Sequence, residues 1–394
     1  SAVQVLATNQ LNVSTDAGGA SVSESVSLTG TAVGIAVGGA DNSFDSSNQT
    51  KATIEDSSSV IGQSVNVNAL HSPTIDNFAF GVAVSVDIST SAFGAALGFS
   101  GAFLQSDQSD SVQAGISDSI VSVSDKITVA ADDQSSMTTS SGAGSLQVSY
   151  GSGGSVALAP SAVTNKVTVG NSVLAWIGQQ PLSDGTLIDA SVASDGSVVS
   201  AEGSITVAAT CDQVIANTAI AVAVSVAIAP DFDSAAGSGA GASSTVTTNN
   251  IVKAAVNGVD DLSVGGADGL SVLGTDSGSV DITVGSAAVS VGWFGASIGI
   301  SLAEIVNNDQ VVAEVQNSII QTGGTSTTGA PIEIIAENTV KLTTDSVATS
   351  LSISIGASGA GGKSNITSDV DVAASFGDGS QVTTALGASP GDLK

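Results

Sequence analysis

The chain has 394 residues, of which 42% are apolar but only 3% aromatic, and 46 are glycine. An apolar fraction of this size argues against disorder, and the scarcity of large rings argues against a wide globular core. Seven lysines and no arginine face 36 acidic residues, so the net charge of −29 would repel phosphate and excludes a nucleic-acid binder.

Runs in which large and small residues alternate recur along the chain. They lie at 31–39, 80–88, 146–160, 219–229, 288–302 and 350–356. In the run 219–229, Val and Ile alternate with Ala and Ser, a period of two that is typical of a β-strand. No stretch carries an apolar face at helical spacing, so the sequence predicts almost no helix.

Shorter patterns flank these runs in a fixed order. A short strand of the form I-x-V-x-A precedes, and an Asn or Asp followed by V-x-A-x-V comes after, for example at 48–61, 250–258 and 309–320. The recurrence predicts one elongated unit over 1–394, built of about six degenerate modules. Their approximate bounds are 11–63, 64–124, 125–203, 204–270, 271–330 and 331–394.

Short strands, small turns and a narrow aliphatic core favour an all-β fold of the parallel β-helix or β-solenoid kind. A module of about 65 residues would then hold three coils of about 20 residues, giving a rod on the order of 90 Å long. The alternative is a set of tandem β-sandwiches, which usually bury more aromatic side chains and use more proline in turns.

The small-residue side of the long strands is a candidate contact surface. If it lies outside, it is either a bland exterior or a flat face on which another sheet or a second copy packs closely. The predicted self-association face consists of Gly34, Ala36, Gly38, Ala221, Ala223 and Ala227.

The order I-x-V-x-A, then AVAVSVAIA at 221–229, then N-x-V-x-A-x-V resembles strand repeats of giant bacterial surface proteins. These are the passenger or shaft regions of autotransporter and filamentous-haemagglutinin-like or leukotoxin-like adhesins. The resemblance covers nearly the whole chain and implies secretion to the bacterial cell surface and a β-helical shaft. The module 145–203 departs from the pattern through a polar insert and Trp176.

The residue types that catalysis needs are scarce. His71 is the only histidine and Cys211 the only cysteine, and the chain contains no G-x-S-x-G motif. Neither aspartate pair, 132–133 or 260–261, stands beside the other groups that polysaccharide cleavage requires. We therefore expect no enzyme and no cofactor, a surface position for His71, and a buried, unreactive Cys211.

Calcium is the one metal that the acidic turns would suit. The weak candidate ligands are Asp231 and Asp233 in the turn PDFDS and Asp268 in GGADG, with solvated carboxylates as the simpler interpretation. The longest apolar run, 218–230, is too short to cross a bilayer as a helix, so no transmembrane segment is expected. A first residue other than Met indicates a processed product or a segment of a longer protein.

Together these patterns predict a non-catalytic extracellular structural protein. It would form a cell-surface shaft, sheath or head-to-tail filament, with itself as the main partner. The alternative is an adhesin that binds a cell-surface or glycan ligand through the atypical segment 176–203, with Trp176 as the candidate contact. A β-helical enzyme acting on polysaccharide is the least favoured.

Overall fold

The computed structural model describes all residues except 57–58, 183–194, 231–232, 324–329, 378 and 385–394. Within the described ranges it contains 26 β-strands and no helix. The ladders between neighbouring strands are parallel. The all-β class is therefore confirmed, and the parallel sheets are compatible with a β-helix.

Each strand pairs with the strand that occupies the same place one module later. β1 (Ala2–Asn9) pairs with β6 (Ser64–His71), which pairs with β11 (Ile127–Asp133). The ladder continues through β16 (Ile205–Ile228), β20 (Leu270–Asn307) and β23 (Ile332–Asn338). In this way Val3, Val65 and Ile127, which the sequence separates widely, stand opposite one another.

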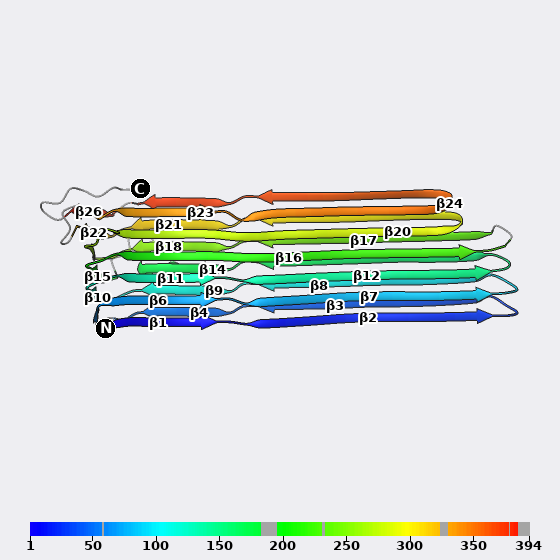
Figure 1. Cartoon of the computed structure of the whole chain (residues 1–394), viewed down its shortest axis with the longest axis horizontal. Helices are drawn as coiled ribbons and strands as arrows, with labels where there is room; N and C mark the ends of the chain where they lie inside the picture. The colour runs from blue at the N-terminus through cyan, green and yellow to red at the C-terminus, as the bar shows by residue number, and fades with distance from the viewer. Residues whose placement is uncertain (57–58, 183–194, 231–232, 324–329, 378, 385–394) are drawn as a thin grey trace.

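This pairing corrects the expected length of a coil. We expected three coils of about 20 residues in each module, but the ladders join residues a whole module apart, such as Thr15 and Asn77, which are 62 positions apart. Each module therefore adds one layer to each sheet. The stack is shorter and the strands longer than expected, and the long dimension of the molecule runs along the strands (Figure 1).

At one end of the strands, three sheets enclose a region that we call the base (Figure 1). Its first sheet is the β1–β6–β11–β16–β20–β23 ladder. The second contains β4 (Gln49–Ile54), β9 (Ser111–Ile116), β14 (Ser172–Gly178), β18 (Ile251–Asn257), β21 (Gln310–Gln316) and β25 (Asp371–Phe376). The third contains β5 (Ser59–Gly62), β10 (Ile120–Val123), β15 (Val198–Ala201), β19 (Asp261–Val264), β22 (Ile319–Thr322) and β26 (Gln381–Thr384).

The rest of each layer runs out from the base and back, and we call this two-layered region the blade. The outgoing layer contains β2 (Asn12–Ser27), β7 (Thr74–Ser89), β12 (Ser136–Gly151), and parts of β16, β20 and β24 (Lys341–Ser368). The returning layer contains β3 (Ala32–Ser46), β8 (Gly94–Gln108), β13 (Ser155–Val169), β17 (Ser234–Thr248), and the later parts of β20 and β24.

The base is filled by columns of aliphatic side chains. Inward positions alternate with outward ones along each strand, so that Val65 and Val67 are buried whereas Asn66 is half-buried. Because the ladders are parallel and in register, each inward residue stacks on an equivalent one in the next layer. The columns therefore repeat Val, Ile, Leu or Ala through the base, which accounts for the low aromatic content.

In the blade the small side chains point inward and the large ones outward. Ala221 and Ala223 are 0% exposed, whereas Ile220 and Val222 between and beside them are 46% and 39% exposed. The cause is the close approach of the two layers: a Cβ placed on Gly38 would lie 1.8 Å from the backbone oxygen of Val82. Only glycine fits there, and few inward positions of the blade carry more than Ala, Ser or Val.

The predicted self-association face is therefore corrected. All of its residues are buried inside the blade, where the facing layer of the same chain covers them. The expected close approach of two sheets does occur, but both sheets belong to the same chain. The set comprises Gly34, Ala36, Gly38, Ala221, Ala223 and Ala227.

Enlarging an inward residue of the blade should destabilise the fold. Ala221→Leu forces an extra isobutyl group between two closely packed layers, and we expect a loss of about 1–3 kcal/mol in the free energy of unfolding. Val222→Leu, one residue along on the outer side, should change it by less than about 0.5 kcal/mol. Urea unfolding of both variants measures the difference, and equal losses would contradict the inward orientation of the small residues.

Candidate functional site

A seam of buried polar residues crosses the molecule where the base meets the blade. Its first column lies at the ends of the first base strands and contains Asn9, His71, Asp133, Cys211, Asp276 and Asn338. Its second column lies just before the strands of the second base sheet and contains Asn48, Asp110, Asn171, Asn250 and Asp309. We call the two columns together the polar seam.

The second column forms a ladder of its own between backbone and side chain. The backbone N–H of Asn48 donates to Asp110 Oδ1 at 2.6 Å, and that of Asp110 to Asn171 Oδ1 at 2.9 Å. The N–H of Asn171 donates to Asn250 Oδ1 at 3.1 Å, and that of Asn250 to Asp309 Oδ1 at 2.6 Å. A short side chain with an acceptor oxygen is needed, which explains the Asn or Asp that opens each V-x-A-x-V pattern.

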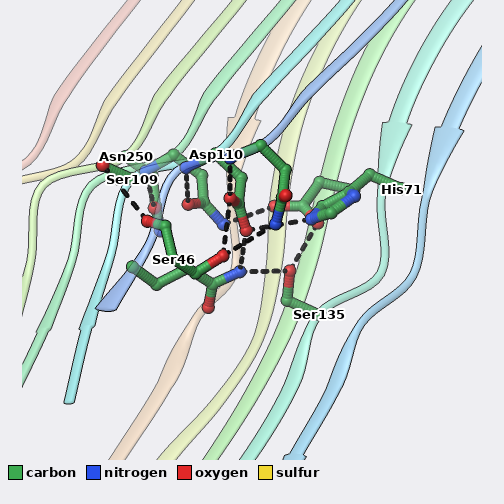
Figure 2. A network of polar contacts seen from close by, with 10 residues as sticks. Ser46, His71, Ser109, Asp110, Ser135 and Asn250 are labelled. Carbon is green, nitrogen blue, oxygen red and sulfur yellow. Dashed lines mark hydrogen bonds and ion pairs between the residues drawn. The ribbon is translucent and has the colours of Figure 1, made fainter. Parts of the chain in front are cut away.

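His71 and Asp110 face each other across the seam, as Figure 2 shows. His71 Nε2 lies 2.9 Å from Asp110 Oδ2, and both side chains are buried. Gln108 Nε2 also donates to Oδ2, at 2.7 Å, and Ser46 Oγ donates to Oδ1 at 2.9 Å. The expected surface position of His71 is therefore wrong, because the alternation along β6 turns this residue inward, opposite a carboxylate that is distant in sequence.

These hydrogen bonds decide the charge state of Asp110. Burial alone would raise the pKa of the Asp110 carboxyl, but the hydrogen bonds with His71, Asn48, Gln108 and Ser46 outweigh it. The pKa of Asp110 therefore lies below its ordinary value, and the carboxylate is ionised at neutral pH.

In the next layer an aspartate and an asparagine exchange places. Asn171 Nδ2 donates to Asp133 Oδ2 at 2.6 Å, and Ser135 Oγ donates to Oδ1 at 2.5 Å. Burial raises the pKa of Asp133 to about 6 and outweighs the hydrogen bonds from Ser135 and Asn171 and the influence of His71. In the sequence Asp133 is one member of an adjacent acidic pair, and only its position in the column reveals that it is buried.

Two aspartates meet further along the seam. Burial, followed by the charge of Asp309 and a hydrogen bond with it, raises the pKa of Asp276 to about 8. Burial also raises the pKa of Asp309, whose oxygens accept hydrogen bonds from the Asn250 backbone at 2.6 Å and from Thr248 Oγ1 at 3.2 Å. The pair holds a shared proton at neutral pH, because two adjacent buried carboxylates cannot both ionise cheaply.

Cys211 stands in the same column between Asp133 and Asp276 and is fully buried, as expected from the sequence. Burial, reinforced by the negative charges of Asp133, Asp276 and Asp309, raises the pKa of its thiol well above the usual value. The thiol is therefore protonated at neutral pH and is a poor nucleophile.

The predicted calcium ligands do not come together. Asp233 and Asp268 are exposed on separate turns, and Asp231 lies outside the described residues. Among the residues that the structure describes, no group of three or more His, Cys, Asp and Glu side chains is arranged to hold a metal ion.

Trp176 is fully buried, in contrast to the exposed ligand platform that the sequence suggested. It packs with Leu174 and Ala255, and its ring lies over Gly115 in β9, where an added Cβ would come within 2.1 Å of the ring. Its neighbouring segment 183–194, the core of the predicted binding insert, lies outside the described residues.

A shallow hollow of about 460 Å³ lies on the third base sheet. Serines and small residues line most of it, and Glu202 is its one ionisable lining residue. This lining offers neither a nucleophile paired with a base nor two carboxylates, the arrangements that hydrolysis requires.

No family model, curated protein or solved structure matches the chain. The described part of the chain also contains no helix that could cross a membrane.

Removing one member of the Asn/Asp ladder should destabilise the fold more than removing its exposed neighbour. Asn250→Ala leaves the buried backbone N–H of Asn171 without its acceptor, so we expect a loss of about 2 kcal/mol in the free energy of unfolding. Asn249→Ala, one residue earlier and exposed, should cost less than about 0.5 kcal/mol. Denaturant unfolding compares them, and similar losses would refute a structural role for the ladder.

The buried carboxyl groups should make the fold more stable at acidic than at alkaline pH. The pKa of Asp276 in the folded state is about 8 against an ordinary value of 3.8, so the folded state binds the extra proton. Its contribution is fully present below about pH 4 and is lost as the pH rises through 8, with Asp133 adding a similar loss up to about pH 6.

Asp276→Asn should therefore flatten the decrease in the unfolding midpoint between pH 5 and pH 9, because the amide keeps the uncharged form at every pH. Asp76→Asn removes the same charge from an exposed position and serves as the control for general charge repulsion. Denaturant titrations at several pH values measure both slopes. If the two variants show the same slope, the buried pair is not the origin of the pH dependence.

Proposed function

We propose that the chain is a β-solenoid of six turns that serves as a non-catalytic structural element, stacking end to end into an extracellular shaft, sheath or filament. The observation that carries this proposal is the match between the first and the last layer. Both present the same set of strands, and both have an open edge along the stack axis.

The two end layers have strands of corresponding length. β1 and β23 have 8 and 7 residues, β4 and β25 have 6 each, and β5 and β26 have 4 each. A second copy placed beyond β23 would therefore offer β1, β4 and β5 to three open strands of matching size and direction. Open edges of this kind are templates for further pairing.

The interior columns also continue to both ends. Val3, Val5 and Ala7 point into the base but are only half-buried, whereas the equivalent Val67 and Ala69 one layer further in are fully buried. A further layer would cover the half-buried residues. Stacking therefore gains both hydrogen bonds and apolar burial.

The chemistry of the chain supports a non-catalytic role. Its single histidine and single cysteine are buried in the polar seam, where no substrate reaches them. The adhesin alternative depended on an exposed Trp176, and the burial of this side chain removes the observation that favoured it. The extracellular location is proposed from the resemblance to secreted surface repeats and from the acidic composition.

A proline at the open edge of β1 should prevent end-to-end assembly without unfolding the chain. The N–H groups of Ser72 and Thr74 donate to the carbonyls of Asn9 and Leu11, so odd-numbered peptide groups of the first layer face inward along the stack. Even-numbered groups, including that of Thr8, face the open edge. Thr8→Pro removes a donor needed only by an added layer, and an edge strand tolerates it.

Wild-type protein at high concentration should form linear assemblies in negative-stain microscopy and sedimentation velocity. Thr8→Pro should abolish them, while Thr8→Ala should assemble as the wild type does. Single particles of one chain for the wild type at millimolar concentration, or unimpaired assembly of Thr8→Pro, would refute end-to-end stacking.

A further inference from the structure

The outgoing layer of the blade has an exposed apolar surface that the end-to-end contact does not use. It is formed by the outward residues in four columns, those that begin at Gly18, Ala20, Val22 and Glu24 of β2 and continue across β7, β12, β16, β20 and β24. We call this surface the ridged face. Its residues are exposed or half-buried, and Val347, Leu351 and Ile353 are 61%, 53% and 57% exposed.

The ridged face is too large and too apolar to be an ordinary protein exterior. Among its residues Glu24, on the edge strand β2, is the one charged side chain, although the whole chain carries a net charge of −29. Six strands at about 4.8 Å and four columns at about 6.6 Å give an area of roughly 750 Å². That exceeds the largest patch on a typical monomer, about 300–600 Å², and approaches the roughly 800 Å² per partner of a standard interface.

The relief of the ridged face alternates from strand to strand. The first column reads Gly18, Phe80, Gly142, Ile220, Gly285, Val347, and the second reads Ala20, Val82, Gly144, Val222, Ala287, Thr349. Strands β7, β16 and β24 therefore form ridges, and β2, β12 and β20 form troughs. The ring of Phe80 leans over Gly142, but the trough is open around Gly144, where an added Cβ would have no atom within 4 Å.

This relief is complementary to itself under one rotation. A twofold axis that runs along the strands, midway between β12 and β16, turns the stack upside down and lays one ridged face on another. The first strand then meets the sixth, the second the fifth, and the third the fourth. Every ridge meets a trough: Phe80 faces the second copy's Gly285, and Val222 faces the second copy's Gly144.

The other two columns need no such alternation. They consist largely of Val and Leu, with Val84 opposite the second copy's Val289 and Leu146 opposite its Val224. Side chains of this size suit the spacing of about 10 Å at which sheets usually pack. The outer surface of the returning layer fits less well, because the same rotation places Phe99 against Ile298 and Phe103 against Leu302, large against large.

We propose that the ridged face binds the ridged face of a second copy of this chain, so that structural units pair laterally in antiparallel fashion. The contact is isologous, and each copy contributes the same strands. It is independent of end-to-end stacking, which uses the open edges of the sheets. The two contacts together would turn single stacks into paired ones.

Acidic residues bound this contact on the side of the base. The rotation sets Asp16 opposite the second copy's Asp345, and Asp76 opposite its Asp281, all four being exposed. Their repulsion is screened by salt, whereas the apolar contact is not. The pairing should therefore strengthen when sodium chloride is raised from about 0.05 M to about 0.5 M.

Gly144→Lys tests the contact at its centre. The added side chain has free space in the single chain, and replacing a strand glycine does not threaten the fold. In the pair it would bury two ammonium groups against Val222, so we expect the dissociation constant measured by sedimentation equilibrium to rise about 100-fold or more. Because lysine lowers the net negative charge, such a loss is not general repulsion.

Gly239→Lys is the matched control. Gly239 lies on β17 in the returning layer, and a Cβ there also has nothing within 4 Å, but it belongs to the opposite surface. Pairing should survive this substitution. Dissociation by Gly239→Lys with no effect of Gly144→Lys would move the interface to the other surface and overturn the proposal.

Cross-linking separates lateral pairing from end-to-end stacking. Mixing a Gly144→Cys variant with a Val222→Cys variant places the two thiols about 10 Å apart in the lateral pair, but about 24 Å or more apart in a stack. A short bismaleimide should join the two variants, also in the Thr8→Pro background that blocks stacking. Absence of the cross-linked species at high salt would overturn the proposal whatever the outcome for stacking.

A lipid surface is the competing occupant of an apolar face. Co-sedimentation with neutral phosphatidylcholine vesicles tests it. Binding that Gly144→Lys abolishes, in a protein that stays monomeric at high salt, would assign the ridged face to lipid and refute the pairing of two copies. No vesicle binding together with the cross-link supports it.

Discussion

The close approach of the two blade layers is the constraint on which the rest of the structure depends. With so little space between the layers, most inward positions must be Gly, Ala, Ser or another small residue. The large β-branched residues that favour strands must then point outward. One spatial requirement thus produces the small interior, the aliphatic exterior and the alternation that is visible in the sequence.

The polar seam lies where this narrow spacing ends. On one side the layers are held apart by Ala and Ser, and on the other the base is filled by columns of Val, Ile and Leu. At the junction the first and second columns place His71 against Asp110, Asp133 against Asn171 and Asp276 against Asp309. Neutral partners, a shared proton or an ion pair satisfy each buried carboxyl group, and a shift in register would leave them unpaired.

Much of the fold was predictable from alternation and recurrence. The period of two identified the strands, and the recurring order of I-x-V-x-A, long strand and Asn/Asp-V-x-A-x-V identified the layers that pair in parallel. The second column of the seam had a visible signal as well, because Asn48, Asn250 and Asp309 open the V-x-A-x-V pattern. What this position does, accepting a hydrogen bond from the layer before, required the structure. Other features could not be predicted because they depend on the partner layer. Alternation shows that two faces differ but not which is inside; Ala221 is buried and Ile220 exposed only because the facing layer stands so close. The distance between β6 and β9 along the chain likewise hid the contact of His71 with Asp110. The size of a coil was misjudged because the strands, rather than the stack, take up the length of each module.

The distance across the stack tests this architecture most directly. Asp16 and Asp345 are exposed, lie in one outward column and belong to the first and last layers, with four layers between them. Spin labels on Asp16→Cys and Asp345→Cys, with Cys211 buried, should give a backbone separation of about 24 Å by pulsed electron paramagnetic resonance at high dilution. A separation of about 70 Å or more, as expected for three short coils per module, would contradict it.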